Sequence, residues 1–248
     1  MTNYFTISPD FSPDHLSGWY IFNTWLQKIT NEPIRLVFYD NFELQREAIE
    51  NDCIDLIYAN PFDAAMLVRH KGFKPLVKPD GYSDEAIIAV HTSSKYKQII
   101  DLQPGSSIAT TDDPDIFMMG LILMEPAELD KSNVELIACE NYILVAKQLI
   151  QGSANAGIFF AEAYDDLSNM VKKQLRILVR SQIDIIHHSL MIGPKLLEKH
   201  RLFQEALLEM AGNEKGKAVL ESLGFDRWQI VNEEEMEFMI DLMDTLSS

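Results

Sequence analysis

Cysteine and positively charged residues are scarce in this chain of 248 residues, and each shortage excludes certain partners or covalent links. The chain has 21 Lys and Arg residues against 38 Asp and Glu residues, which gives a formal net charge of -17 at pH 7. Nucleic acid and anionic membrane surfaces would be repelled, so neither is expected as a partner. The two cysteines, Cys53 and Cys139, fall in different halves of the chain. A disulfide would have to bridge those halves, so two free thiols are expected.

Long apolar runs are also missing. No uninterrupted hydrophobic stretch approaches the roughly twenty residues that a membrane helix requires, so insertion into a membrane is not expected. The start, Met1-Thr2-Asn3, lacks the basic and apolar regions of a secretory leader. The sequence as written therefore predicts a cytoplasmic protein, or a periplasmic one if a leader has been removed. With 47% hydrophobic residues, the chain can still bury a large core.

One pattern occurs twice, about one hundred positions apart. Residues 48–64 and 148–164 each read as the end of an amphipathic helix, a polar turn, a short apolar strand opened by Asp or Asn, and a sharp turn into another helix. Two related halves are therefore expected. In an open α/β sheet, ligands bind beyond the carboxyl ends of the strands, where helix N-termini present free N–H groups. If two such edges face each other, the gap between them, bordered by Asn60 and Asp113, is a binding cleft.

Alternating apolar strands and amphipathic helices predict an α/β fold with largely parallel sheets. In the first half we expect strands at 4–7, 34–39, 54–59 and 73–77, and helices at 15–29, 41–51 and 61–71. In the second half we expect strands at 107–110, 134–138, 156–160 and 175–179, and helices at 115–124, 141–151 and 162–174. The C-terminal part is expected to be helical over 194–210, 214–223 and 233–246, with an extended piece at 228–231. A strand at 85–91 and a segment at 181–186 cross between the halves, and two crossings make a hinge.

Three stretches resemble the signature segments of a known family. They are residues 54–62 (IDLIYANPF), 107–114 (SIATTDDP) and 216–225 (GKAVLESLGF). They look like the phosphonate-binding, PhnD-like substrate-binding proteins of phosphate, phosphite and phosphonate ABC transporters, and the resemblance covers nearly the whole chain.

The resemblance implies a type 2 periplasmic-binding fold. Its two lobes would be residues 1–84 with 186–248 and residues 85–185, each a mostly parallel sheet flanked by helices, joined by two crossing strands. The lobes would close by hinge motion on a small-molecule ligand, such as an oxyanion or an organic acid. A transporter permease or a signalling protein is the macromolecular partner that this resemblance implies.

The family's anion-binding stretch is only partly present. In the family, an Asp-Pro pair precedes Ser, Thr and Gly residues that cradle the phosphonate, whereas Asp113-Pro114 is followed here by Asp115-Ile116-Phe117. Asp115 would itself satisfy the helix N-terminus and compete with a dianion. Capping is therefore favoured over ligand contact for Asp115, and a larger, less charged ligand is an alternative to phosphonate.

The candidate ligand-binding residues lie at strand ends, in the turns that follow, and at the second crossing. They are Tyr58, Asn60, Pro61 and Phe62 in the first half, Thr110, Thr111, Asp113, Asp115 and Phe160 in the second, and His187 with His188. Loop and cap structure explains many of these residues equally well. Adjacent histidines on a strand point to opposite faces, so the His187-His188 pair does not predict a metal site. No metal or other cofactor is expected.

Catalytic patterns are missing from the sequence. It has no glycine-rich phosphate loop, nucleophile elbow or metalloprotease helix, so no catalytic residues are assigned. The sequence favours a non-enzymatic solute-binding protein. Two alternatives stay open: a cytoplasmic enzyme on the same fold, as in the alternative menaquinone pathway and thiamine-pyrimidine synthesis, and a cytoplasmic ligand sensor.

Overall fold

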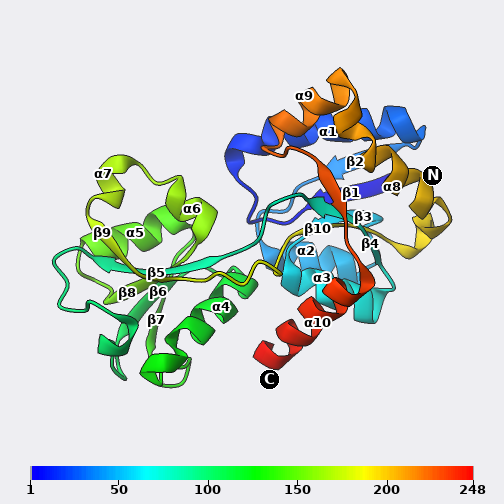
Figure 1. Ribbon diagram of the computed structural model, residues 1–248. Helices are drawn as coiled ribbons and strands as arrows, with labels where there is room; N and C mark the ends of the chain where they lie inside the picture. Colours follow the sequence, from blue (N-terminus) through cyan, green and yellow to red (C-terminus); the bar gives the residue numbers. More distant parts are fainter. Residues whose placement is uncertain (1, 248) are drawn as a thin grey trace. The chain divides into compact units, whose positions relative to one another are not determined.

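The computed structural model describes residues 2–247, and side chains over residues 2–243 apart from Glu233. The chain divides into two compact units (Figure 1). The first unit consists of residues 2–82 and His187–Leu246, and the second of Ser83–Ile186. Each unit has its own sheet and its own hydrophobic core, and the chain passes from one unit to the other twice.

The sheet of the first unit has six strands in the order β11-β4-β10-β3-β1-β2. Their bounds are β1 Asn3–Ile7, β2 Ile34–Val37, β3 Leu56–Ala59, β4 Lys74–Pro79, β10 Ser189–Ile192 and β11 Trp228–Ile230. Strand β1 is parallel to β2 and β3, whereas β10 is antiparallel to β3 and β4, and β11 is antiparallel to β4. Strands β1 to β4 therefore run in one direction, as expected for a mostly parallel sheet, and β10 and β11 run in the opposite direction. Strand β10 does so because the chain comes back from the second unit and inserts it between β3 and β4.

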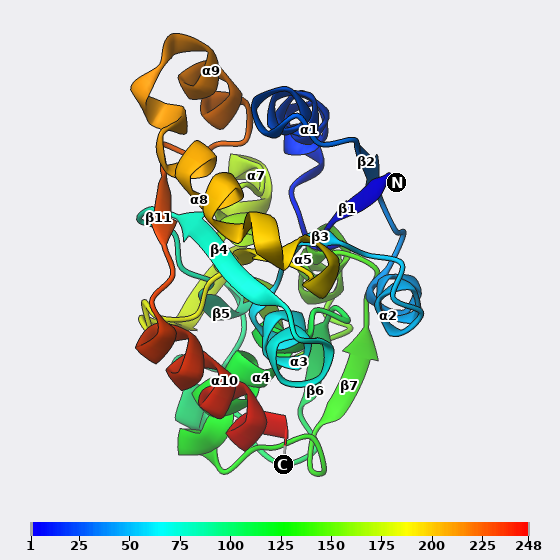
Figure 2. The same ribbon diagram turned by 90° about the vertical axis from the view of Figure 1, so that its right-hand side faces the viewer.

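Helices cover both faces of this sheet. Figure 2 shows α1, α8 and α9 on one side and α2 and α3 on the other. The bounds are α1 Leu16–Thr30, α2 Phe42–Glu50, α3 Pro61–Lys71, α8 His200–Leu208, α9 Glu214–Ser222 and α10 Glu233–Ser247. The single helix expected over 194–210 is instead α8 with 3-10 segments at Pro194–Lys199 and Met210–Gly212. In the first of these, the Leu196 N–H bonds to the Gly193 carbonyl at 3.0 Å, three residues back, so this segment has the tighter winding of a 3-10 helix.

Aromatic side chains fill the core of the first unit between the sheet and helix α1. Trp19 packs edge-on against Phe5, with ring centroids 6.2 Å apart, and lies 4.9 Å from the ring of Tyr58. Phe225 lies 6.0 Å from the same tyrosine ring. Burial of such large aromatic rings is a main source of the folding stability of this unit. Because Tyr58 lies in β3, the same packing fixes the position of that strand.

The second unit has five strands in the order β7-β6-β8-β5-β9. The bounds are β5 Ala86–His91, β6 Ser107–Thr110, β7 Glu135–Ala138, β8 Ala156–Phe160 and β9 Leu175–Arg180, with α4 Pro114–Met124, α5 Tyr142–Ile150, α6 Ala161–Asp165 and α7 Asn169–Lys172. Strand β6 is parallel to β7 and β8, whereas β5 is antiparallel to β8 and β9. The helix expected over 162–174 is broken into α6 and α7, because the Ser168 hydroxyl caps a new helix by accepting the Val171 N–H.

The segments that pass between the units, 80–85 and 181–188, have no strand pairing in the described chain. Both cysteines are free, Cys53 exposed in the first unit and Cys139 buried in the second. Among the described residues, no helix combines the length and the apolar character needed to cross a membrane.

Candidate ligand-binding site

The carboxyl ends of β1 and β3 are neighbours in the first unit, and a buried polar network covers them. Ser8 follows β1, and its N–H bonds to the Tyr58 carbonyl at 2.8 Å. Asn60 follows β3 and is fully buried. Its Oδ1 accepts the Asp63 N–H at 2.7 Å, while its Nδ2 lies 3.2 Å from Ser8 Oγ and 3.0 Å from Asp63 Oδ2. Asn60 therefore caps α3 and at the same time ties the two strand ends together.

A partly buried ion pair extends this network to helix α2. The Arg46 guanidinium donates to both carboxylate oxygens of Asp63, at 2.6 Å from Nε and 3.2 Å from the second nitrogen. The same guanidinium lies over the rings of Phe42 and Phe62, at 5.4 and 4.9 Å from their centroids. Burial raises the pKa of Asp63 above its usual value, although the hydrogen bonds and charge of Arg46 oppose the rise. Phe62, predicted as a ligand contact, here supports Arg46.

Asp10 and His188 form a second acid–base pair, next to the carboxyl end of β3. His188 Nε2 lies 3.1 Å from Asp10 Oδ2, and the imidazole stacks on the ring of Tyr58 at 5.2 Å and 25°. Burial disfavours the charged form of Asp10, but the charge and hydrogen bond of His188 outweigh it and hold the pKa of Asp10 below its usual value. The structure thus brings Tyr58 and His188 together, and it adds Asp10, which the sequence analysis did not single out.

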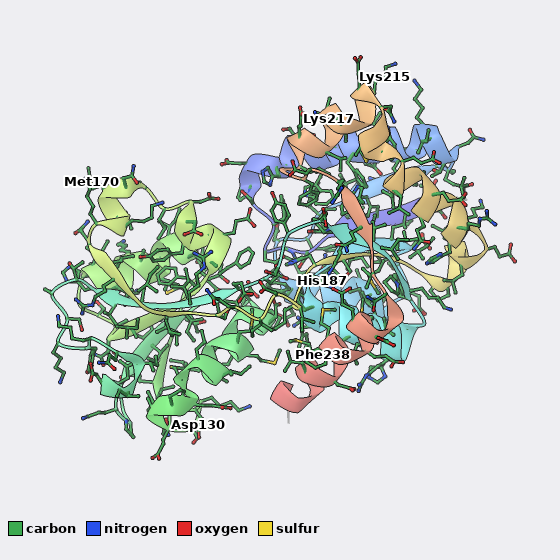
Figure 3. The ribbon with its side chains drawn as sticks, viewed as in Figure 1. Asp130, Met170, His187, Lys215, Lys217 and Phe238 are labelled. Atoms are coloured by element: carbon green, nitrogen blue, oxygen red, sulfur yellow. The ribbon has the colours of Figure 1, made fainter. Side chains whose placement is uncertain are left out.

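His187 and His188 have different partners. His187 is buried, and its Nδ1 lies 3.1 Å from Ser189 Oγ. Its Nε2 is 3.5 Å from Oε1 of Glu235, in the first turn of α10. His187 itself is labelled in Figure 3. Whereas His188 belongs to the polar edge formed by β1 and β3, His187 belongs to the contacts that anchor α10.

In the second unit, carboxylate side chains of the protein itself occupy the turn between β6 and the N-terminus of α4. Asp113 Oδ1 accepts the Ile116 N–H at 3.4 Å as the cap of α4, and the Thr111 hydroxyl accepts the Asp113 N–H at 3.4 Å. Asp113, not Asp115 as expected, is therefore the cap of this helix; Asp115 lies in the first turn of α4 and is fully buried, as Asp113 nearly is. Two carboxylates therefore meet the positive end of this helix, in the place where an anion could otherwise bind.

Tyr142 completes this turn. It is the first residue of α5, and its hydroxyl donates to Asp113 Oδ2 at 2.7 Å. Burial, followed by the negative charge of Asp113, raises the pKa of Tyr142 well above its ordinary value, so the hydroxyl keeps its proton. Thr110 is buried at the end of β6, and its hydroxyl donates to the Thr111 carbonyl at 3.3 Å.

The remaining predicted residues have plain structural positions. Pro61 is the first residue of α3, where its missing N–H costs nothing. Phe160 is half-buried and precedes α6, whereas its neighbour Phe159 points into the core beside Tyr142, with ring centroids 6.2 Å apart.

Sequence reasoning missed Asp10, Arg46 and Tyr142. Asp10 and Tyr142 had a usable signal, since each closely follows a strand whose carboxyl end neighbours that of a strand already chosen. Arg46 lies within helix α2 and had no comparable signal.

Residues 5–236 match the model of a protein family described as the periplasmic phosphonate substrate-binding protein of ABC transporters. The chain belongs to this family. The resemblance inferred from the three sequence stretches is thereby confirmed. A comparison with curated proteins finds no match.

Solved structures of this family and of related binding proteins share the fold. A Xanthomonas citri protein bound to ATP superposes with a TM-score of 0.82 at 10% identity, over 99% of this chain and 98% of that one. PhnD1 from Prochlorococcus marinus in complex with methylphosphonate also gives 0.82 at 10% identity, with 99% and 98% coverage. The periplasmic aliphatic sulphonate binding protein SsuA from Escherichia coli gives 0.67 at 15% identity, with 98% and 87% coverage. The expected type 2 periplasmic-binding fold is therefore confirmed.

Proposed function

We propose that this protein captures a small organic solute for an ABC importer. The single observation that carries the proposal is the family match over residues 5–236, which spans both units. The polar strand ends of each unit support it, because strand ends and helix N-termini are where α/β sheets bind ligands. In the first unit these are Tyr58, Asn60 and His188, and in the second Thr110, Thr111 and Asp113.

The ligand is proposed to be an organic solute that is not held by a dianionic group at the start of α4. Relatives with the same fold are described as bound to methylphosphonate or to ATP, and both ligands carry negatively charged oxygens. In this chain, Asp113 and Asp115 are already buried at that helix start. A small dianion placed there would meet two like charges, so the ligand is expected to be less negative than methylphosphonate or to carry a hydrogen-bond donor.

Calorimetric titration of the purified protein, freed of bound solute by unfolding and refolding, tests this proposal. The panel contains methylphosphonate, phosphate, an aliphatic sulphonate, ATP, and the same carbon skeletons bearing an amine or a neutral amide. Tight binding of at least one solute, with methylphosphonate among the weaker ones, is expected. Tight methylphosphonate binding would overturn the ligand assignment while keeping the solute-binding role. Turnover of a solute without tight binding would overturn the role itself.

We also propose that the protein works in the periplasm with a membrane permease, because the family is described as periplasmic. Cell fractionation followed by immunoblotting tests the compartment, and co-purification with a membrane protein after crosslinking tests the partner. Recovery in the cytosolic fraction without a membrane partner would favour a cytoplasmic sensor instead.

A further inference from the structure

Glu85 is a buried carboxylate that the proposed ligand site does not use. It directly precedes β5 and is 8% exposed. Its Oε1 accepts the N–H groups of Ile183 and Asp184 at 2.8 and 2.9 Å, and its Oε2 accepts the hydroxyl of Ser181. Donors from three residues of the returning segment therefore converge on one side chain, which ties residues 181–184 to the start of β5.

Backbone hydrogen bonds reinforce this carboxylate on both sides. The Ser181 N–H bonds to the Ala86 carbonyl at 2.9 Å, and the Ala86 N–H bonds back to Ser181 Oγ at 2.8 Å. Closer to the boundary between the units, the Asp84 N–H bonds to the Ile186 carbonyl at 2.7 Å. The outgoing residues 84–86 and the returning residues 181–186 are thus fastened to each other within the second unit.

Within the first unit, Glu235 contacts both the outgoing and the returning part of the chain. It lies in the first turn of α10 and pairs with Lys78 Nζ at the end of β4. Its Oε1 also lies 3.5 Å from Nε2 of His187, the first residue after the chain returns. On this side too, one carboxylate contacts both crossings: it pairs with Lys78 of the outgoing strand, and it lies beside the ring of the returning His187.

Two further hydrogen bonds fix residues 80–82 to the first unit, next to the point where the chain leaves it. The Asp80 N–H bonds to the Arg227 carbonyl at 2.9 Å. The Tyr82 hydroxyl donates to the Gly224 carbonyl, and its ring packs edge-on against Phe225 at 5.6 Å. Up to Tyr82, the outgoing chain is fixed to the first unit.

We propose that Glu85 and Glu235 are positioning residues of the joint between the two units. They fasten the paired crossing segments to the second and the first unit respectively. Bending is thereby confined to the backbone around Ser83 and to the Ile186–His187 peptide. This inference rests on contacts within each unit and is independent of which ligand the protein binds.

Amide exchange of the full-length protein, followed residue by residue by NMR, tests the anchoring. In the wild type, the amides of Asp84, Ile183 and Asp184 should exchange slowly and that of Ser83 fast. Glu85→Gln should accelerate exchange at Ile183 and Asp184 by about tenfold or more, because the amide that replaces the carboxylate cannot accept all of its donors. Glu140→Gln is the matched control, since Glu140 is exposed in the same unit and loses the same charge.

Spin labels report on the joint itself. Cys53 is exposed in the first unit, and Lys131→Cys supplies an exposed thiol in the second. The distribution of distances between the labels should broaden about twofold in Glu85→Gln and in Glu235→Gln. It should stay as in the wild type in Glu140→Gln and in Glu237→Gln, whose residue is exposed on the same helix as Glu235.

The results separate anchoring from general stability. Unchanged exchange at Ile183 and Asp184, or an equal acceleration over β6 and β7, would overturn the role of Glu85. An unchanged distance distribution in both Gln variants would overturn the joint. If Glu85→Gln does not fold, Ser181→Ala removes one of the donors and should shift both measurements in the same direction.

Discussion

The hydroxyl of Tyr142 donates a 2.7 Å hydrogen bond to Asp113 Oδ2, and this bond joins the starts of two helices in the second unit. Asp113 caps α4, and Tyr142 opens α5. The parallel strands β6 and β7 precede these helices and place their carboxyl ends side by side. A contact between residues 29 positions apart in sequence therefore follows from strand register.

Tyr142→Phe should destabilise the second unit by about 1–2 kcal/mol, because a buried carboxylate oxygen loses its donor. Chemical denaturation followed by amide exchange in β6 and β8 would measure the loss. Tyr164→Phe is the control, since this ring packs against Phe159 at 5.3 Å and its hydroxyl makes no hydrogen bond among the described residues. An equal effect of the two substitutions would show that the hydrogen bond to Asp113 contributes nothing.

Tyr142 should also make stability depend on pH in the alkaline range. Its pKa in the folded protein is raised well above the ordinary 10.0, by burial and then by Asp113. Above pH 10 the unfolded chain loses this proton while the folded protein keeps it, so the free energy of unfolding falls as the pH rises. The fall should be shallower in Tyr142→Phe. Parallel curves for the two proteins would contradict this assignment.

Gly18→Ala should destabilise the first unit by about 2–4 kcal/mol through a steric clash. A Cβ at Gly18 of helix α1 would lie 2.1 Å from the Ser222 carbonyl oxygen at the end of α9, and backbone cannot move aside cheaply. The clash outweighs the gain of about 1 kcal/mol that Ala usually brings to a helix. Gly212→Ala, where a Cβ meets nothing within 4 Å, is the control and should be nearly neutral in thermal unfolding. A Gly18→Ala protein as stable as this control would mean that α1 and α9 are not closely packed.

The fold was predictable where local signals agree. Helix α3 was predicted with its observed bounds, Pro61–Lys71, because Asn60 caps it, Pro61 opens it and Gly72 ends it in the left-handed region at φ 67°. Strand β10 was missed, because its four residues are stabilised by β3 and β4, which lie more than a hundred positions earlier in the chain. The alternation of strands and helices predicts the parallel pairs, but the antiparallel β10 and β11 depend on where the chain returns to the first sheet, which the local pattern does not specify.

The site was predictable only as single residues. Tyr58 and His188 were both chosen from their positions, but their stacking depends on β10 returning beside β3. Arg46 was overlooked because a lone arginine in an amphipathic helix is ordinarily a solvated charge. Its pairing with Asp63 arises only when α2 and α3 are brought together by the sheet.

Arg46→Met should cost about 3 kcal/mol of stability at pH 7, because it leaves the buried Asp63 carboxylate without its cation. Burial already raises the pKa of Asp63 above its ordinary value. The free energy of unfolding therefore falls as the pH rises through that pKa and the buried carboxyl group loses its proton. Without Arg46 this effect should grow, and the cost of the substitution should shrink as the pH falls and Asp63 takes up a proton. Urea denaturation at pH 7 and at pH 4 measures both. Arg35→Met, at an exposed position outside the described ion pairs, should be nearly neutral at both. A cost of Arg46→Met that does not change with pH would mean that packing on Phe42 and Phe62, not charge, is what the arginine supplies.

Asp115→Ser should raise the affinity for methylphosphonate by about tenfold or more, because it removes a buried negative charge from the start of α4 and supplies a hydroxyl donor. The hydroxyl and the first N–H groups of the helix would then face the anion as they do at other helix N-termini. Asp112→Ser is the matched control, since Asp112 is exposed in the same turn and removes the same formal charge. Titration calorimetry of the wild type and both variants with methylphosphonate gives the comparison. An equal gain in the two variants would point to net charge alone. No gain in Asp115→Ser would mean that its carboxylate does not exclude the dianion, and that selectivity is set away from this helix.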